Sequence, residues 1–212
     1  MMKFLLVNGS PHKNGCTNRA LEEVAKVLSD EGLETEIYWV GAKPVGGCMG
    51  CFQCEKLKKC VIEDDVNEFR QKAYEADGFI FGSPVHYAGA SGNLVGFMDR
   101  LFFSEFIGNG NRAFYLKPAA AVVSARRAGT TTVFSQLMKY FTVQEMPVIS
   151  TRYWNMVHGM EAKEVETDGE GLCNMRVLGH NMAYFLKCRE AANRAGIPLP
   201  TREEPVFTNF VH

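Results

Sequence analysis

The sequence predicts an α/β fold in which a five-stranded parallel sheet lies between two layers of helices. Short apolar or β-branched runs alternate with segments of helical periodicity, without an internal repeat or a low-complexity segment. Strands that alternate with helices pair in parallel and are covered on both faces. Polar loops follow the first, third and fourth runs. In the strand order 2-1-3-4-5 these loops would meet at the carboxyl edge of the sheet, where open α/β sheets bind ligands.

The first half of the chain provides two strands and two helices. Residues 4–7 form a continuous apolar run typical of a buried strand, and residues 20–28 repeat apolar side chains with helical period. Residues 35–40 alternate and carry β-branched and aromatic side chains, so they are expected to form the second strand. Asp65 followed by Glu68 predicts a capping box at the start of the second helix.

The second half continues the alternation up to a C-terminal helix. The apolar runs at residues 78–82, 119–123 and 147–150 are expected to be the third, fourth and fifth strands. Further helices are expected where apolar side chains recur with helical period, at residues 94–101, 134–141 and 175–194. We expect residues 1–212 to form one domain, with a cysteine-rich insertion at about residues 41–63.

The composition is that of an ordinary globular protein. Hydrophobic residues make up 46% of the chain, charged residues make up 22%, and the formal net charge is -1. This balance removes the broad electrostatic signature of nucleic-acid or membrane-surface binding, so neither partner is expected. No apolar run is long enough to span a bilayer, and the sequence begins without a signal-peptide pattern. We therefore expect a cytoplasmic protein.

The loop between the first strand and the first helix has the features of an anion cradle. The free N–H groups and the positive dipole end of a helix N-terminus attract a phosphate. Gly9 and Gly15 allow close backbone approach, and Ser10, Thr17 and Asn18 add side-chain donors. The glycine spacing does not match a dinucleotide fingerprint, and no lysine stands where a Walker A loop requires one. A monophosphate therefore fits best, with a polar turn that binds no ligand as the alternative.

Four of the seven cysteines lie close together in the sequence, as Cys48, Cys51, Cys54 and Cys60. Their C-x2-C-x2-C-x5-C spacing lets the thiolates converge on one centre, as in the runs that hold iron-sulfur clusters. Structural zinc usually takes two separated C-x2-C pairs, so a cluster is favoured over zinc. Thiols that only pack in the core of a loop are the other interpretation.

With these loops, the chain resembles the flavodoxin-like NAD(P)H-dependent FMN reductase and iron-sulfur flavoprotein superfamily over most of its length. Residues 8–17 are similar to the FMN-phosphate loop of that superfamily, residues 83–87 to its isoalloxazine loop, and residues 124–131 stand at its third flavin-side loop. The resemblance implies a flavodoxin-like three-layer sandwich. The cysteine run is similar to the compact motif with which iron-sulfur flavoproteins bind a 4Fe-4S cluster.

The resemblance also implies which residues contact the cofactors. The implied FMN contacts lie in the three loops and are Ser10, His12, Asn14, Cys16, Thr17, Asn18, Pro84, Val85, His86, Tyr87, Gly89, Ser124, Gly129 and Thr130. The chemistry would take place at flavin N5, so no catalytic nucleophile is expected. His86 and Tyr87 are candidate assistants, with hydrogen bonding or packing alone as their alternative role. Cys48, Cys51, Cys54 and Cys60 would hold the candidate 4Fe-4S cluster.

Three functions follow from these patterns. The first is an FMN-dependent NAD(P)H oxidoreductase that reduces a quinone, a flavin or another small-molecule acceptor. The second is an iron-sulfur flavoprotein that passes single electrons between a 4Fe-4S cluster and FMN, with a ferredoxin-like redox partner. The third is a non-catalytic flavin- or phosphate-binding protein. The resemblance further implies a homodimer or a homotetramer.

Overall fold

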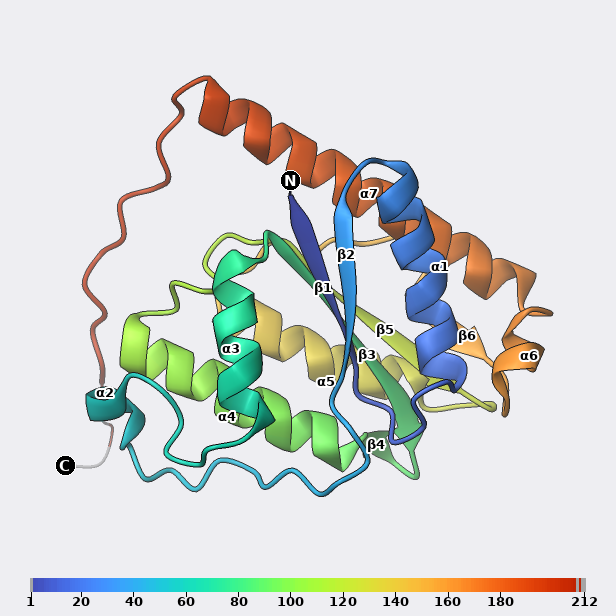
Figure 1. The fold of residues 1–212 in the computed structure, drawn as a ribbon, viewed down its shortest axis with the longest axis horizontal. Coiled ribbons are helices and arrows are strands. Elements are labelled where there is room, and N and C mark those ends of the chain that lie inside the picture. Colours follow the sequence, from blue (N-terminus) through green and yellow to red (C-terminus); the bar gives the residue numbers. More distant parts are fainter. Residues whose placement is uncertain (1, 209, 211–212) are drawn as a thin grey trace.

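A parallel sheet forms the centre of the molecule and confirms the predicted strand order (Figure 1). The computed structural model describes residues 2–208 and 210. Its parallel strands run in the order β2-β1-β3-β5-β6, which matches the predicted order 2-1-3-4-5, because the additional short strand β4 pairs antiparallel with the end of β3. The strands are β1 Lys3–Asn8, β2 Glu34–Trp39, β3 Gly78–His86, β4 Gly89–Ala90, β5 Ala119–Ala125 and β6 Met156–His158.

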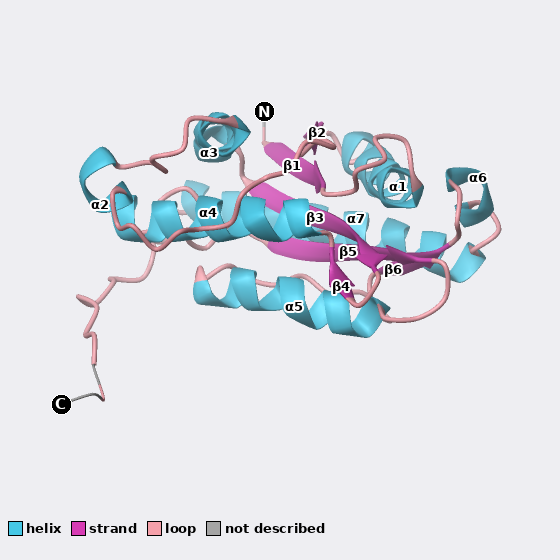
Figure 2. Ribbon diagram, turned by 90° about the horizontal axis from the view of Figure 1, so that it is seen from below, coloured by secondary structure: helices cyan, strands magenta, loops and turns pink. Residues whose placement is uncertain are grey.

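Helices lie on both sides of the strands, as Figure 2 shows. They are α1 Cys16–Asp30, α2 Cys54–Leu57, α3 Asp65–Glu75, α4 Gly92–Asn109, α5 Thr130–Val143, α6 Ala162–Val165 and α7 Gly169–Arg194. α1 and α7 cover one face of the sheet, and α3, α4 and α5 cover the other. Within the described part of the chain, every helix is too short or too polar to cross a membrane.

Alternate side chains of the central strands enter two separate cores. In β1, Leu5 and Val7 pack with α3, α4 and α5, whereas Phe4 and Leu6 pack with α1 and α7, and all four side chains are fully buried. A strand buried on both faces needs apolar side chains at every position rather than at every second one. This packing explains why β1, β3 and β5 are continuous apolar runs in the sequence.

The edge of the sheet was predicted at the wrong residues. The edge strand is β6, and the predicted strand at residues 147–150 makes only one isolated parallel bridge, between Val148 and Ala119. β3 is also longer than predicted, since it continues beyond residue 82 to His86 and forms a hairpin with β4. Pairing with neighbouring strands, which no local pattern encodes, decides both boundaries.

The N-cap of α3 lies one residue earlier in the chain than predicted. Asp64 is the N-cap, and its Oδ1 accepts a hydrogen bond from the backbone N–H of Val66 at 3.1 Å. The predicted capping box of Asp65 and Glu68 is therefore wrong. Adjacent aspartates both satisfy the preference for a capping oxygen, so composition alone does not distinguish them.

The buried Lys117 makes the free energy of unfolding depend on pH. Its side chain is 9% exposed and donates from Nζ to the carbonyl oxygen of Ala73 at 2.9 Å, and burial lowers its pKa from 10.5 to about 8. The native state therefore releases this proton at a lower pH than the unfolded chain, so the free energy of unfolding rises with pH between about 8 and 10.5. The rise due to Lys117 is at most about 3 kcal/mol.

We expect Lys117→Met to remove that rise. Urea unfolding of the wild type and the variant at pH 7.5 and pH 10.5 measures it. Loss of the hydrogen bond to Ala73 lowers the stability at both pH values, so the change between the two pH values is what reports on the proton. Equal pH dependence in the two proteins would show that Lys117 does not titrate in this range.

Candidate functional site

Polar loops meet at the carboxyl edge of the sheet and enclose an open cleft of about 740 Å3. Small-molecule sites typically measure about 300–1,000 Å3. The cleft is lined by the first loop, by the ends of β3 and β5, and by residues 159–162, which run from the end of β6 to the first residue of α6. The predicted contacts that line it are Ser10, His12, Asn14, Cys16, Thr17, Pro84, Val85 and Ser124. The structure thus brings residues of all three predicted loops to one cleft.

The first loop is held in shape by its own polar groups. The buried Asn8 side chain accepts a hydrogen bond from Ser10 N at 3.0 Å and donates one to the carbonyl oxygen of Lys13 at 3.0 Å. The Ser10 hydroxyl oxygen accepts a hydrogen bond from His12 N at 3.1 Å. These bonds fix the loop before any ligand enters. Affinity benefits from such preorganisation, because little ordering is left for the binding step.

The N-terminus of α1 forms one wall of the cleft and is suited to an anion. α1 starts at Cys16 with Gly15 as N-cap, and neither a capping side chain nor an acidic residue of the first turn interacts with this terminus. The positive end of the helix dipole is therefore not neutralised by the helix itself. Lys13 and Arg126, which also line the cleft, add positive charge. Glu161 lines it too and opposes them in part.

Short hydrogen bonds join the loops to one another. The hydroxyl groups of Thr17 and Ser124 are 2.8 Å apart and connect the start of α1 to the end of β5. The Ser83 hydroxyl oxygen accepts a hydrogen bond from Ser91 N at 3.0 Å, which ties the end of β3 to the start of α4. Both hydrogen bonds are buried, so water does not compete for them.

The remaining predicted contacts lie outside the lining of the cleft, and they are Asn18, His86, Tyr87, Gly89, Gly129 and Thr130. The Asn18 side chain donates to Glu22 Oε1 at 2.6 Å, and Thr130 is buried at the start of α5. Tyr87 is fully exposed at the turn between β3 and β4, where its φ of 55° is positive. Only a ligand that extends beyond the cleft would reach the turn of the hairpin at Tyr87.

Sequence reasoning missed the segment at residues 159–162. It follows β6, which is three residues long and whose apolar pattern is too short to predict a strand. The Cys16 thiol donates to the carbonyl oxygen of Gly159 at 3.3 Å, which links this segment to α1. Burial raises the pKa of Cys16, and the nearby carboxylates of Glu164 and Glu161 raise it further. Cys16 is thus a neutral thiol that donates a hydrogen bond.

A second site lies along α4, where residues 41–63 pack, which we call the cysteine segment. In Figure 1 this segment runs as an extended trace from the end of β2 beside α4 to α2. The Asn93 side chain donates to the carbonyl oxygen of Lys43 at 3.0 Å, and the Asn109 side chain donates to that of Lys58 at 2.9 Å. α4 therefore holds the segment near both of its ends.

Two glycines of α4 let the segment approach the helix closely. A Cβ atom at Gly96 would stand 2.7 Å from the carbonyl oxygen of Val45, and one at Gly108 would stand 2.9 Å from that of Cys54. Real Cβ atoms essentially never stand this close to another heavy atom, so a side chain at either position would force the segment to shift away from α4. Gly96, Arg100 and Gly108 are spaced by four and eight residues and form one face of α4.

The four cysteines of the segment line a single cavity against this face of α4. The cavity walls are otherwise mainly apolar and include Met49, Phe52, Val61, Ile62 and Phe103. Cys54 is buried, Cys60 is partly buried, and Cys48 and Cys51 are exposed. Burial raises the pKa of Cys54, and the proximity of the other three sulfurs raises it further. All four cysteines thus line the same cavity.

The arrangement of these thiols bears on the kind of metal group that would fit. Among residues 2–208 and 210, no three His, Cys, Asp or Glu side chains are close enough together to hold one metal ion. A 4Fe-4S cluster takes one thiolate at each of four irons, so its four ligands stand farther apart than the ligands of a single metal ion. Four thiols around one apolar cavity match that donor set in kind and in number.

Comparisons with known sequences show which proteins this chain is similar to. The sequence model of the family described as NADPH-dependent FMN reductase matches residues 2–161. An iron-sulfur flavoprotein of Methanocaldococcus jannaschii is 33% identical over 195 residues, which cover 88% of this chain and 98% of that protein. An iron-sulfur flavoprotein of Methanosarcina thermophila is 29% identical over 160 residues, which cover 75% of each chain.

Solved structures show the same fold at low sequence identity. RosB, with a bound flavin-derived intermediate, has a TM-score of 0.69 and 16% identity, and the match covers 100% of this chain and 94% of RosB. A flavodoxin from the domain Archaea has a TM-score of 0.57 and 16% identity, and the match covers 88% of this chain and 99% of the flavodoxin. These likenesses confirm the flavodoxin-like fold.

Adding a methyl group at Gly108 tests the packing of the cysteine segment. Overpacking against the backbone at Cys54 costs about 1–3 kcal/mol, whereas the better helix propensity of alanine returns about 1 kcal/mol. We expect Gly108→Ala to lower the free energy of unfolding by about 1 kcal/mol and to speed alkylation of the Cys54 thiol, which urea unfolding and mass spectrometry measure.

The matched control is Gly92→Ala in the first turn of the same helix. A Cβ atom there has no neighbour within 4 Å. This variant should be as stable as the wild type or more stable, with unchanged alkylation of Cys54. The same effects in both variants would contradict a specific contact at Gly108.

Proposed function

The chain belongs to the NADPH-dependent FMN reductase family and is a flavin-dependent oxidoreductase, and from this premise we propose that it passes electrons between FMN in the cleft and a 4Fe-4S cluster at Cys48, Cys51, Cys54 and Cys60. The observation that carries the proposal is the convergence of the four thiols on one cavity. The match to an iron-sulfur flavoprotein over 98% of its length supports it.

The residues of the cleft fit FMN. The N-terminus of α1 and the donors Ser10 and Thr17 suit a dianionic phosphate, which is a stronger match than the polar turn without a ligand. Pro84 and Val85 present an apolar surface at the end of β3 for the flavin ring. When bound, FMN would supply the redox chemistry, by accepting a hydride from a nicotinamide and releasing electrons. The protein holds the cofactor and orients it.

The residues around the four thiols fit a cluster. The apolar walls lower the local dielectric and limit access of water, while the exposed side of Cys48 and Cys51 leaves a route for electrons to a partner. A cluster at this place would pass single electrons. We propose a small electron-transfer protein of the ferredoxin kind as that partner, since Lys56 and Lys58 beside the site suit an acidic surface.

The second candidate function is NAD(P)H-dependent reduction of a quinone, a flavin or another small acceptor without a cluster. The open cleft and the exposed hairpin around Tyr87 favour it, because they leave room beside FMN for a second small molecule. Both functions use the same FMN site. They differ in whether the four cysteines hold iron.

Thr17→Val tests the FMN site. Valine keeps the shape of threonine but removes the hydroxyl that lines the cleft, so we expect FMN to bind about 10-fold more weakly, which corresponds to about 1.4 kcal/mol for one lost hydrogen bond. Quenching of flavin fluorescence during titration of the apoprotein measures the Kd. Thr142→Val at the exposed end of α5 is the control and should bind FMN normally. Unchanged affinity in Thr17→Val would place the phosphate elsewhere.

Cys51→Ala tests the cluster. Loss of one of four thiolate ligands should remove most of the iron and acid-labile sulfide from protein purified without oxygen, while FMN binding stays the same. Cys188→Ala, which changes an exposed cysteine on α7, is the control and should retain the wild-type iron content. A wild type that binds FMN but contains no iron would support the second candidate function. Equal iron in both variants would contradict the assignment of ligands.

A further inference from the structure

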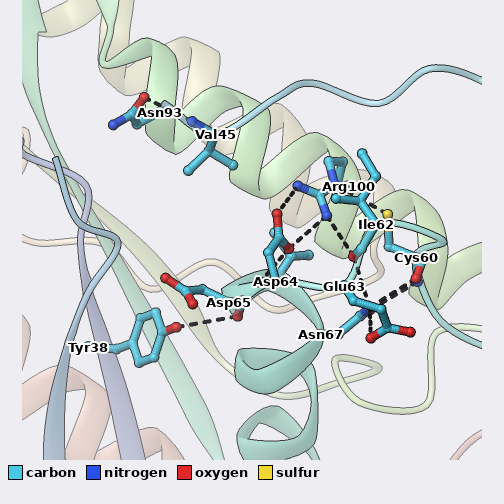
Figure 3. A network of polar contacts seen from close by, with 11 residues as sticks. Tyr38, Val45, Cys60, Ile62, Glu63, Asp64, Asp65, Asn67, Asn93 and Arg100 are labelled. Atoms are coloured by element: carbon cyan, nitrogen blue, oxygen red, sulfur yellow. Dashed lines mark hydrogen bonds and ion pairs between the residues drawn. The ribbon is translucent and has the colours of Figure 1, made fainter. Parts of the chain in front are cut away.

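A buried arginine touches the four-cysteine cavity from the side of α4. Arg100 is 1% exposed, lines the cavity, and donates a hydrogen bond from Nε to the sulfur of Cys60 at 3.2 Å. Figure 3 shows the guanidinium between α4 and the segment that carries Cys60. Arginine is rarely buried to this extent unless its charge is paired and its donors are satisfied.

The other donors of Arg100 bind the loop that follows Cys60. Nη1 and Nη2 donate to the two carboxylate oxygens of Asp64 at 2.6 and 2.7 Å, and Nη2 also donates to the carbonyl oxygen of Ile62 at 3.1 Å. A bidentate pair between a guanidinium and a carboxylate fixes orientation as well as distance. The plane of the guanidinium is thus set by the loop, and the direction of Nε toward the sulfur is set with it.

The backbone of Cys60 is fixed independently of its side chain. Asn67 of α3 accepts a hydrogen bond from Cys60 N at 3.0 Å and donates one to the carbonyl oxygen of Cys60 at 2.9 Å. Asp64 caps the same helix, as described above. Cys60 is the cysteine separated from the others by the longest gap, so the register of α3 and the side chain of Arg100 together bring it to the cavity.

The charge of Arg100 also acts on the sulfur. Hydrogen bonds to cluster sulfurs and nearby positive charge stabilise the more negative, reduced state of an iron-sulfur cluster and raise its reduction potential. Asp64 opposes this effect only in part, because its side chain is 35% exposed and therefore screened by water, whereas Arg100 lies in the wall of an apolar cavity.

We propose that Arg100 is a positioning residue of the four-cysteine site, which holds Cys60 in place and raises the reduction potential of the cluster bound there. This inference rests on the proposed function. It assigns to α4 a role in the redox properties of the site in addition to its packing role.

The reduction potential of the cluster measures this role directly. Protein with FMN and cluster is titrated with dithionite without oxygen, the reduced cluster is followed by electron paramagnetic resonance, and iron and sulfide are assayed on the same samples. Arg100→Gln removes the positive charge and the bidentate pair with Asp64. This variant should contain less iron and have a more negative cluster potential than the wild type. Arg100→Lys keeps the charge, so its potential should lie between the two.

Asp64→Asn should shift the cluster potential in the direction opposite to Arg100→Gln. It removes the negative charge that pairs with Arg100, and asparagine caps helices as well as aspartate does, so α3 is retained. Its cluster potential should be less negative than that of the wild type. Arg70→Gln is the matched control, because Arg70 is also buried and pairs with Glu105 at 3.2 Å without a contact to the cysteines. It should keep the wild-type potential even where it lowers stability.

Shifts of the cluster potential in opposite directions in Arg100→Gln and Asp64→Asn would support the inference. If Arg100→Gln does not fold, Arg100→Lys is compared with Asp64→Asn in the same way. The inference would be overturned, without overturning the cluster, by either of two results. One is a wild-type cluster potential in the Arg100 variants, and the other is a shift of the same sign in all variants including Arg70→Gln. A wild type without iron and sulfide would overturn the cluster itself and this inference with it.

Discussion

The close contact between the cysteine segment and α4 is the interaction on which the second site depends. Gly96 and Gly108 let backbone meet backbone, while Asn93 and Asn109 bind the carbonyl oxygens of the segment. Without this contact, Cys48 and Cys51 would lie on an exposed loop with no fixed relation to Cys60. Packing against one face of α4 thus places the four cysteines around a single cavity.

The same helix relates the two sites to each other. The start of α4 is tied to β3 through Ser83 and Ser91, next to the cleft that fits FMN, whereas Arg100 lies about two and a half turns further along. At a rise of 1.5 Å per residue, the two positions are about 12–14 Å apart along the helix. A rigid helix between a flavin site and a cysteine site keeps their separation constant.

Much of this arrangement could be predicted from the sequence, because it depends on local patterns. The apolar runs of β1, β3 and β5 follow from burial on both faces, and the loops after them gather Ser10, Thr17 and Ser124 at one edge. The edge strand β6 and residues 159–162 could not be predicted, since pairing with β5 defines them.

Arg100 was missed for a similar reason. A charged residue within the apolar run of α4 is a signal, but its partners Cys60 and Asp64 are brought to it only by tertiary packing.

The proposed electron transfer requires that one chain carries both a flavin site and an iron-sulfur site. The visible absorption spectrum of wild-type protein purified without oxygen, with iron and acid-labile sulfide assayed on the same sample, tests it most directly. We expect flavin bands, a broad cluster absorbance and roughly four irons per chain. Flavin bands without iron would contradict the second site, and the absence of flavin after addition of FMN would contradict the first.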